Sequence, residues 1–387
     1  MATLLLIIIY LAFIGLGLPD SLFGTAWPAI YTELGLPFSM GNMVTIIITC
    51  GTITSSLFSS RVIAKYGTGK VTAVSVMLTA AALLGFSVSG SFWALCLWAI
   101  PYGLGAGGVD AALNNYVALH YSSRDMSWLH CMWCMGAATG PYVMAWALGG
   151  GHSWGMGYRT IGILQVALTT VLLCSLKLWK AAPAPDTGSD ESAGPLTLPQ
   201  IAAIPGAKAV MAAFFCYCAL ESTAGLWASS YLTLHRGVDA QTAAGFASLF
   251  YLGITAGRAL NGFLTMKFSD TTLIRMGCCI LAAGVAALLL PLGQTAALAG
   301  LVLVGLGCAP VYPCIIHSTP AHFGPARSQA LIGVQMASAY TGSLLMPPLF
   351  GLLANHITVA LYPMYLLLLL ATMAAMHELL CRTAQHH

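Results

Sequence analysis

The sequence predicts an all-α membrane protein in which twelve transmembrane helices form two six-helix bundles around a central cavity. Of its 387 residues, 58% are hydrophobic and only 6% are charged, whereas soluble domains carry about 25% charged residues. Its apolar residues form runs long enough to cross a hydrocarbon layer of ~30 Å. One extended polar stretch divides these runs into two halves. This composition excludes a soluble enzyme.

Apolar segments separated by polar residues or by Gly and Pro define the expected helices. The first run has no basic start and no cleavage site, so we expect a retained span rather than a signal peptide. The stretch 180–205, rich in Pro, Ser and Asp, is expected to be a flexible linker between domains 1–179 and 206–387. The expected spans are 4–32, 40–66, 70–89, 92–121, 126–149, 156–179, 207–235, 240–267, 271–293, 296–321, 327–354 and 358–381.

The distribution of Lys and Arg predicts the orientation, because cationic loops stay in the cytoplasm. With both termini in the cytoplasm, most of the fourteen basic residues fall on the inner side. We therefore expect an integral protein of a bacterial inner membrane, acting as a monomer. The net charge of +3 is small and spread over loops, so no nucleic-acid partner is expected. The inner residues are Arg61, Lys65, Lys70, Arg124, Lys177, Lys180, Lys208, Lys267, Arg275, Arg327 and Arg382.

The two halves repeat one another at an offset close to 202 residues (305 − 103). The motif Asp20-Ser-x-x-Gly-x-x-Trp27 of the first span recurs as Glu221-Ser-x-x-Gly-x-Trp227 in the seventh. Each matched pair is weak evidence alone, but several pairs in one register predict two homologous halves. Such halves enclose a central site in many transporters. Further pairs are Gly51 with Gly253, Gly103 with Gly305, Gly105 with Gly307, and Gly140 with Gly342.

Twelve spans, a six-plus-six repeat and a central linker resemble the major facilitator superfamily over essentially the whole chain. That family carries Gly-x-x-x-Asp-Arg-x-Gly-Arg-Arg/Lys after its second span, a loop that latches the cytoplasmic side. Here Ser60 replaces the first Gly, Ala64 the Asp and Lys65 the Arg, whereas Gly67 and Lys70 are kept. The second copy has Met266 at the acidic position. The usual latch is therefore not expected in this chain.

Within that superfamily, three motifs resemble the fucose-permease branch of proton-coupled sugar symporters. They are Leu-Pro-Asp20 in the first span, Asp110-Ala-Ala-Leu-Asn114-Asn115 in the fourth and Leu129-His130-x-x-Trp133 in the fifth. The branch places functional acids in its first and fourth spans, so the resemblance implies roles for Asp20 and Asp110. The fourth-span acid of the branch is a glutamate, which is a departure here.

Asp20, Asp110 and Glu221 are the acids expected inside the membrane, where a charge costs about 2.5–3.5 kcal/mol on insertion scales. Burial disfavours a charged carboxyl, so such a group can load a proton on one side and release it on the other. Asp110 is the first choice as the coupling acid, because Asn114 lies one turn away on the same face. The alternative is structural: Asp20 would cap a helix restart, and Asp110 would hold neighbouring helices.

Arg258 is the basic residue expected within a span. Its guanidinium could bind an anionic solute, neutralise Glu221 or another acid, or reach toward the membrane surface. If it binds the solute, that solute is a sugar acid or another anion.

A sugar pocket needs amide groups for hydroxyls and aromatic faces for C–H patches. The candidate solute-binding residues occupy repeat-related positions or one face of a span, and the alternative for each is packing or an interfacial aromatic belt. They are Asn114, Asn115, His130, Trp133, Trp27, Trp227, Tyr312, His317 and Gln335, with Arg258 added for an anion.

The leading hypothesis is a secondary transporter that couples protons to a monosaccharide or a similar small polar solute by alternating access. The alternatives are a proton-driven exporter of amphipathic compounds and a uniporter of a sugar acid or other organic anion. A membrane enzyme or sensor has no supporting residue set. No metal and no cofactor are expected, because the proton gradient would supply the energy.

Overall fold

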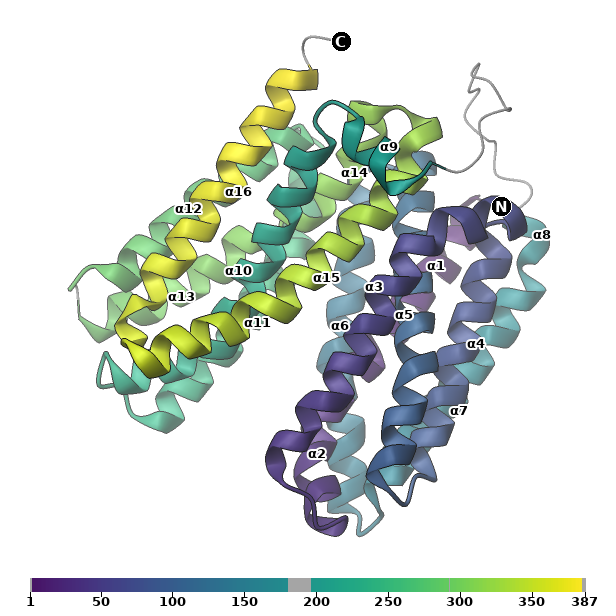
Figure 1. Cartoon of the computed structure of the whole chain (residues 1–387), viewed down its shortest axis with the longest axis horizontal. Coiled ribbons are helices and arrows are strands. Elements are labelled where there is room, and N and C mark those ends of the chain that lie inside the picture. The colour runs from purple at the N-terminus through teal and green to yellow at the C-terminus, as the bar shows by residue number, and fades with distance from the viewer. Residues whose placement is uncertain (1, 180–195, 292, 385–387) are drawn as a thin grey trace. The chain divides into compact units, whose positions relative to one another are not determined.

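The computed structural model describes residues 2–179, 196–291 and 293–384, and these residues form helices joined by short turns (Figure 1). The first half of the chain contains α1 (Ala2–Asp20), α2 (Leu22–Glu33), η1 (Phe38–Met40), α3 (Gly41–Tyr66), α4 (Thr68–Ser87), α5 (Phe92–His120), α6 (Ser123–Gly149), α7 (Trp154–Cys174) and α8 (Leu176–Trp179). The second half contains α9 (Leu198–Ala203), α10 (Ala207–Leu234), α11 (Ala240–Leu264), α12 (Asp270–Leu289), α13 (Gln294–Cys308), α14 (Val311–Phe323), α15 (Pro325–His356), η2 (Val359–Leu361) and α16 (Tyr362–Ala384).

Ten helical segments in the described ranges have the length and mean hydropathy of membrane spans. Helices α6 and α11 are less apolar but contain 27 and 25 residues, more than the ~20 that cross a bilayer. Together they account for twelve helices (10 + 2), at the places predicted from the sequence. An all-α membrane fold is therefore confirmed.

The first and tenth spans are each broken into two helices. The first breaks at Ser21, two residues after Pro19, and the tenth breaks at Ala309 and Pro310. Proline removes a backbone donor and clashes with the preceding turn, so a helix kinks or restarts near it. The break in the first span leaves Asp20 at the end of α1, in the middle of a long apolar segment.

The chain forms two compact units, which are described separately. The first contains Met1–His120 and Leu129–Pro195, and the second contains Tyr121–Trp128 and Leu196–His387. In the first unit α5 packs against α3 and α4, and α4 packs against α7. In the second unit α13 packs against α11 and α12, and α10 packs against α15 and α16. The start of α6 thus belongs to a different unit from the rest of that helix.

The repeat-related glycines Gly103 and Gly305 make equivalent close helix contacts in the two units. A Cβ on Gly103 would lie 2.2 Å from the carbonyl oxygen of Ile48, and one on Gly305 would lie 2.3 Å from that of Phe250. The two glycines are 202 residues apart in the sequence (305 − 103), and so are the two residues whose carbonyls they approach (250 − 48). Small residues let helix backbones approach closely in membranes. The predicted repeat is therefore present in the packing, not only in the sequence.

Candidate functional site

Asp20 lies at the break in the first span and is exposed to solvent, with both carboxylate oxygens hydrogen bonded. The Tyr102 hydroxyl of α5 donates to Oδ1 at 2.9 Å, and Nε1 of Trp133 in α6 donates to Oδ2 at 3.0 Å. Asp20 does not cap the restarted helix, because the structure shows its oxygens directed to these two side chains. Two neutral donors stabilise the carboxylate without cancelling its charge.

A cavity of about 80 Å³ within the first unit adjoins this carboxylate. Its wall is mainly aromatic and aliphatic, and three of its residues, Thr45, Tyr102 and Tyr158, carry hydroxyl groups. The lining residues are Pro19, Asp20, Phe23, Thr45, Ile48, Leu83, Phe86, Tyr102 and Tyr158. An apolar cavity with a few converging polar groups is the usual form of a small-molecule site. Since about 10–15 Å³ of such volume holds one water molecule, the cavity has room for water beside Asp20.

Asp110, Asn114 and His130 form a second polar group in the same unit, and this one is buried. Nδ2 of Asn114 donates to Oδ1 of Asp110 at 2.7 Å, as expected for residues one helical turn apart. Nε2 of His130 lies 3.0 Å from Oδ1 of Asn114. Since an amide oxygen only accepts, Nε2 is the protonated nitrogen of this ring. The three residues are 5%, 0% and 4% exposed, and Asn115 beside them is also buried.

The first unit thus holds two of the three predicted membrane acids, in different surroundings. Asp20 lines the cavity, whereas Asp110 is buried and hydrogen bonded to Asn114.

Glu221 and Arg258 form an ion pair in the second unit. Nη2 of Arg258 lies 3.7 Å from Oε1 of Glu221, and the Tyr217 hydroxyl hydrogen bonds to Oε2. The guanidinium is 3% exposed and the carboxylate 22% exposed. Of the three roles considered for Arg258, the structure shows neutralisation of Glu221.

The remaining aromatic and amide candidates donate or accept within their own unit. Nε1 of Trp27 donates to the carbonyl of Phe38, and Nε1 of Trp227 donates to that of Pro347. The Trp27 indole thus contacts the start of η1, and the Trp227 indole contacts the interior of α15. The Tyr312 hydroxyl lies 3.1 Å from the Met336 sulfur, and the buried Gln335 accepts from Thr319 at 3.1 Å. The structure does not bring these four residues to the Asp20 cavity.

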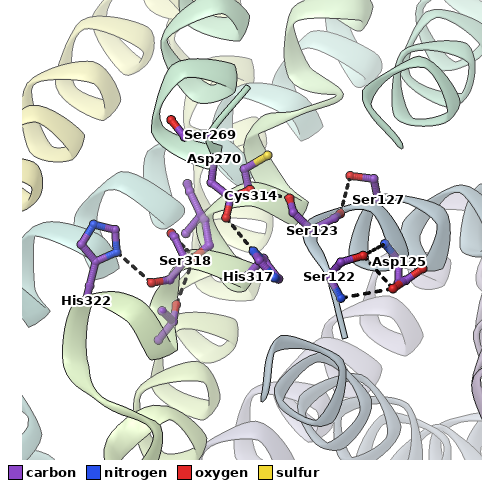
Figure 2. Close-up of polar contacts among 12 residues, drawn as sticks. Ser122, Ser123, Asp125, Ser127, Ser269, Asp270, Cys314, His317, Ser318 and His322 are labelled. Carbon is purple, nitrogen blue, oxygen red and sulfur yellow. Dashed lines mark hydrogen bonds and ion pairs between the residues drawn. The ribbon is translucent and has the colours of Figure 1, made fainter. Parts of the chain in front are cut away.

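His317 belongs to a different polar cluster, which Figure 2 shows. Its Nδ1 lies 2.6 Å from Oδ2 of Asp270 at the start of α12, and the Ser123 hydroxyl donates to the other oxygen of Asp270. Close by, Nδ2 of Asn261 donates to the Ser127 hydroxyl at 2.8 Å. These contacts hold the first residues of α6 on the second unit, so His317 lies among structural hydrogen bonds.

Three partners of the candidate residues were missed at the sequence level: Tyr102, Tyr217 and Asp270. Tyr217 lies four residues before Glu221, and that spacing on one helix face was an available signal. Tyr102 is 82 residues from Asp20, and Asp270 is 47 residues from His317. Without tertiary information, no spacing rule connects either pair.

Comparisons with known proteins agree with this architecture. A family model described as Major Facilitator Superfamily matches residues 9–347 and also 210–383. The chain is 23% identical over 285 residues to bypass of stop codon protein 6 of Saccharomyces cerevisiae, and that match covers 67% of this chain and 56% of the yeast protein. The chain thus spans little more than half the length of this relative.

Solved transporter structures share the fold. FucP in its outward conformation matches with a TM-score of 0.80 at 14% identity, over 96% of this chain and 97% of that one. The human organic anion transporter TETRAN matches with a TM-score of 0.75 at 14% identity, over 97% and 98%. The proton:xylose symporter XylE, bound to 6-bromo-6-deoxy-D-glucose, matches with a TM-score of 0.74 at 12% identity, over 96% and 94%. Likeness at such low identity establishes the fold alone.

Proposed function

Because the chain belongs to the Major Facilitator Superfamily, we propose that it couples proton movement to uptake of a monosaccharide or similar small polar solute by alternating access. The observation that supports this most directly is the Asp20 carboxylate on the wall of an aromatic-lined cavity. A solvated acid deep in an apolar span is costly unless it has a task. Accepting and releasing a proton is the task that its position allows.

The buried, hydrogen-bonded residues Asp110, Asn114 and His130 support the same proposal. Protonation of Asp110 would turn an acceptor into a donor, and the amide of Asn114 would have to adjust. That adjustment would reach His130 through the hydrogen bond at Oδ1 of Asn114. In this proposal Asp20 is the acid that exchanges protons. Asp110 is the buried acid whose protonation would change the hydrogen bonds between α5 and α6.

The proposal also includes the class of solute and the membrane in which the protein lies. The matches to sugar symporters in the first, fourth and fifth spans support a place near the fucose-permease branch. The Lys and Arg distribution supports cytoplasmic termini in a bacterial inner membrane. Among the candidate solute-binding residues, Trp133 is the one whose indole reaches the Asp20 carboxylate in the structure.

The test is uptake by proteoliposomes with an imposed proton gradient, screened first against sugars. Asp20→Asn and Asp110→Asn should each reduce accumulation to the passive level but keep counterflow exchange, because the amide preserves shape and loses the titrating group. Asp239→Asn is the matched control, since Asp239 caps α11 and Asn caps helices equally well. Full accumulation by both site variants would refute proton coupling through these acids.

A further inference from the structure

The ion pair of the second unit has a consequence for the charge of the solute. Arg258 is almost fully buried, and the carboxylate of Glu221 is the more exposed member of the pair. A buried guanidinium requires an anion or other strong acceptors nearby, because desolvated charge is costly. Glu221 supplies that anion from within the chain.

The carboxylate is also held in place by a second contact. The Tyr217 hydroxyl bonds to Oε2 of Glu221, and the same hydroxyl lies 2.9 Å from the carbonyl oxygen of Cys308 in α13. Tyr217 is itself fully buried. Glu221 is thus fixed by a cation from α11 and by a rigid phenol from its own helix α10, so it is not a mobile surface acid.

A solute carboxylate that approached Arg258 would meet Glu221 first. It would experience repulsion from a fixed negative charge, and it would have to displace that charge from the guanidinium to form its own pair. Displacement would leave Glu221 with its phenol contact and without the cation. A hydroxylated neutral solute meets neither obstacle, since it can hydrogen bond to the carboxylate as it stands.

We propose that Glu221 is an anion surrogate that occupies Arg258 and excludes anionic solutes, so that the transported solute is neutral. The proposal rests on the proposed function only in taking the chain to be a carrier of a small solute. It deepens that function by choosing neutral sugars over sugar acids. It predicts a latent anion site, because removal of the Glu221 charge takes away the carboxylate that lies beside the guanidinium.

The experiment measures thermal unfolding in detergent at constant ionic strength, with formate, glucuronate or chloride added and no proton gradient. Glu221→Gln and Glu221→Ala should gain saturable stabilisation by formate, with an apparent affinity roughly tenfold or more above that of the wild type. Glu221→Ala leaves room for formate at the position of the lost carboxylate. The double variant E221A/R258Q should lose the gain, which assigns it to the guanidinium.

The outcomes separate this proposal from the preceding one. Saturable glucuronate binding by the wild type, or no formate gain in either Glu221 variant, would overturn the proposal. If a variant is too unstable to purify, unfolding is measured in membranes, where rescue by formate and not by chloride supports the proposal and equal behaviour in both salts refutes it. Because binding is measured without a gradient, a failure of proton coupling would leave this result unaffected.

Discussion

Asp20 and Glu221 occupy equivalent positions in the two halves, yet their surroundings differ in charge. Asp20 is hydrogen bonded to a phenol and an indole and lines a cavity. Glu221 is paired with the guanidinium of Arg258 and held by Tyr217. The repeat-related glycines Gly103 and Gly305 make equivalent contacts. The two halves therefore share packing at this pair and differ in the charges around their acids.

This difference concerns the counter-ion of each acid. A carboxylate held by neutral donors keeps a negative charge that a proton can neutralise. A carboxylate beside a buried guanidinium keeps its charge but has a counter-ion. The two acids therefore differ in whether a cation lies beside them, although sequence similarity alone ranks them as equals.

The largest loss of stability is expected at the ion pair, where the two halves differ most in charge. Glu221→Gln leaves a buried guanidinium without its carboxylate, and removal of one partner of a buried pair costs about 3–5 kcal/mol. Denaturant unfolding in detergent should show this loss, and the double variant E221Q/R258Q should recover most of it. Asp20→Asn should cost less, about 1.5–3 kcal/mol, because it weakens hydrogen bonds to a charged group and breaks no ion pair. Equal losses for Glu221→Gln and Asp20→Asn would remove the electrostatic distinction.

An intermediate effect is expected from the donors that hold Asp20. Tyr102→Phe deletes the hydroxyl that donates to Oδ1, and a hydrogen bond to a charged group is worth about 1.5–3 kcal/mol. We expect proton-driven accumulation to fall by roughly tenfold, the rate equivalent of ~1.4 kcal/mol. The control is Tyr365→Phe, which removes a hydroxyl that donates to the Met346 carbonyl in the second unit. A similar loss in both variants would show that the effect is general destabilisation.

The smallest effect should be equal in the two halves, because it tests their shared packing. Gly103→Ala and Gly305→Ala would each place a methyl group against a backbone carbonyl, and overpacking of this kind costs about 1–3 kcal/mol. Thermal unfolding should report similar losses for both. Gly24→Ala, where a Cβ meets nothing within 4 Å, should be neutral or slightly stabilising. A large difference between the first two variants would show that the repeat has diverged in its packing as well.

Most of the fold was predictable because lipid imposes a simple rule: apolar runs of sufficient length become helices. The run 92–121 became α5 (Phe92–His120), and 207–235 became α10 (Ala207–Leu234). The break near Pro19 followed from proline chemistry. Boundaries shifted where polar residues begin a helix, as at Asp270, which starts α12 although the predicted span began one residue later.

The site was predictable only where contacts are local. Asn114 and Asp110 are one turn apart, so their hydrogen bond followed from helix geometry. The pairing of Glu221 with Arg258 was one of three roles considered, because opposite charges in one apolar domain tend to meet. The indole of Trp133 reaches Asp20 across 113 residues of sequence. Only the packing of α6 beside α1 and α5 determines such a contact.

Helix α6 begins in one compact unit and continues in the other, with Ser123 and Ser127 bonded to Asp270 and Asn261 of the second unit. A chain severed within 180–195 and coexpressed as two fragments would carry these four residues on different polypeptides, two on each. Residues 121–128 of the first fragment would then hydrogen bond to the second fragment. Association of the two fragments can then be measured. A weaker association with Asp270→Ala would report the contribution of its hydrogen bond to Ser123.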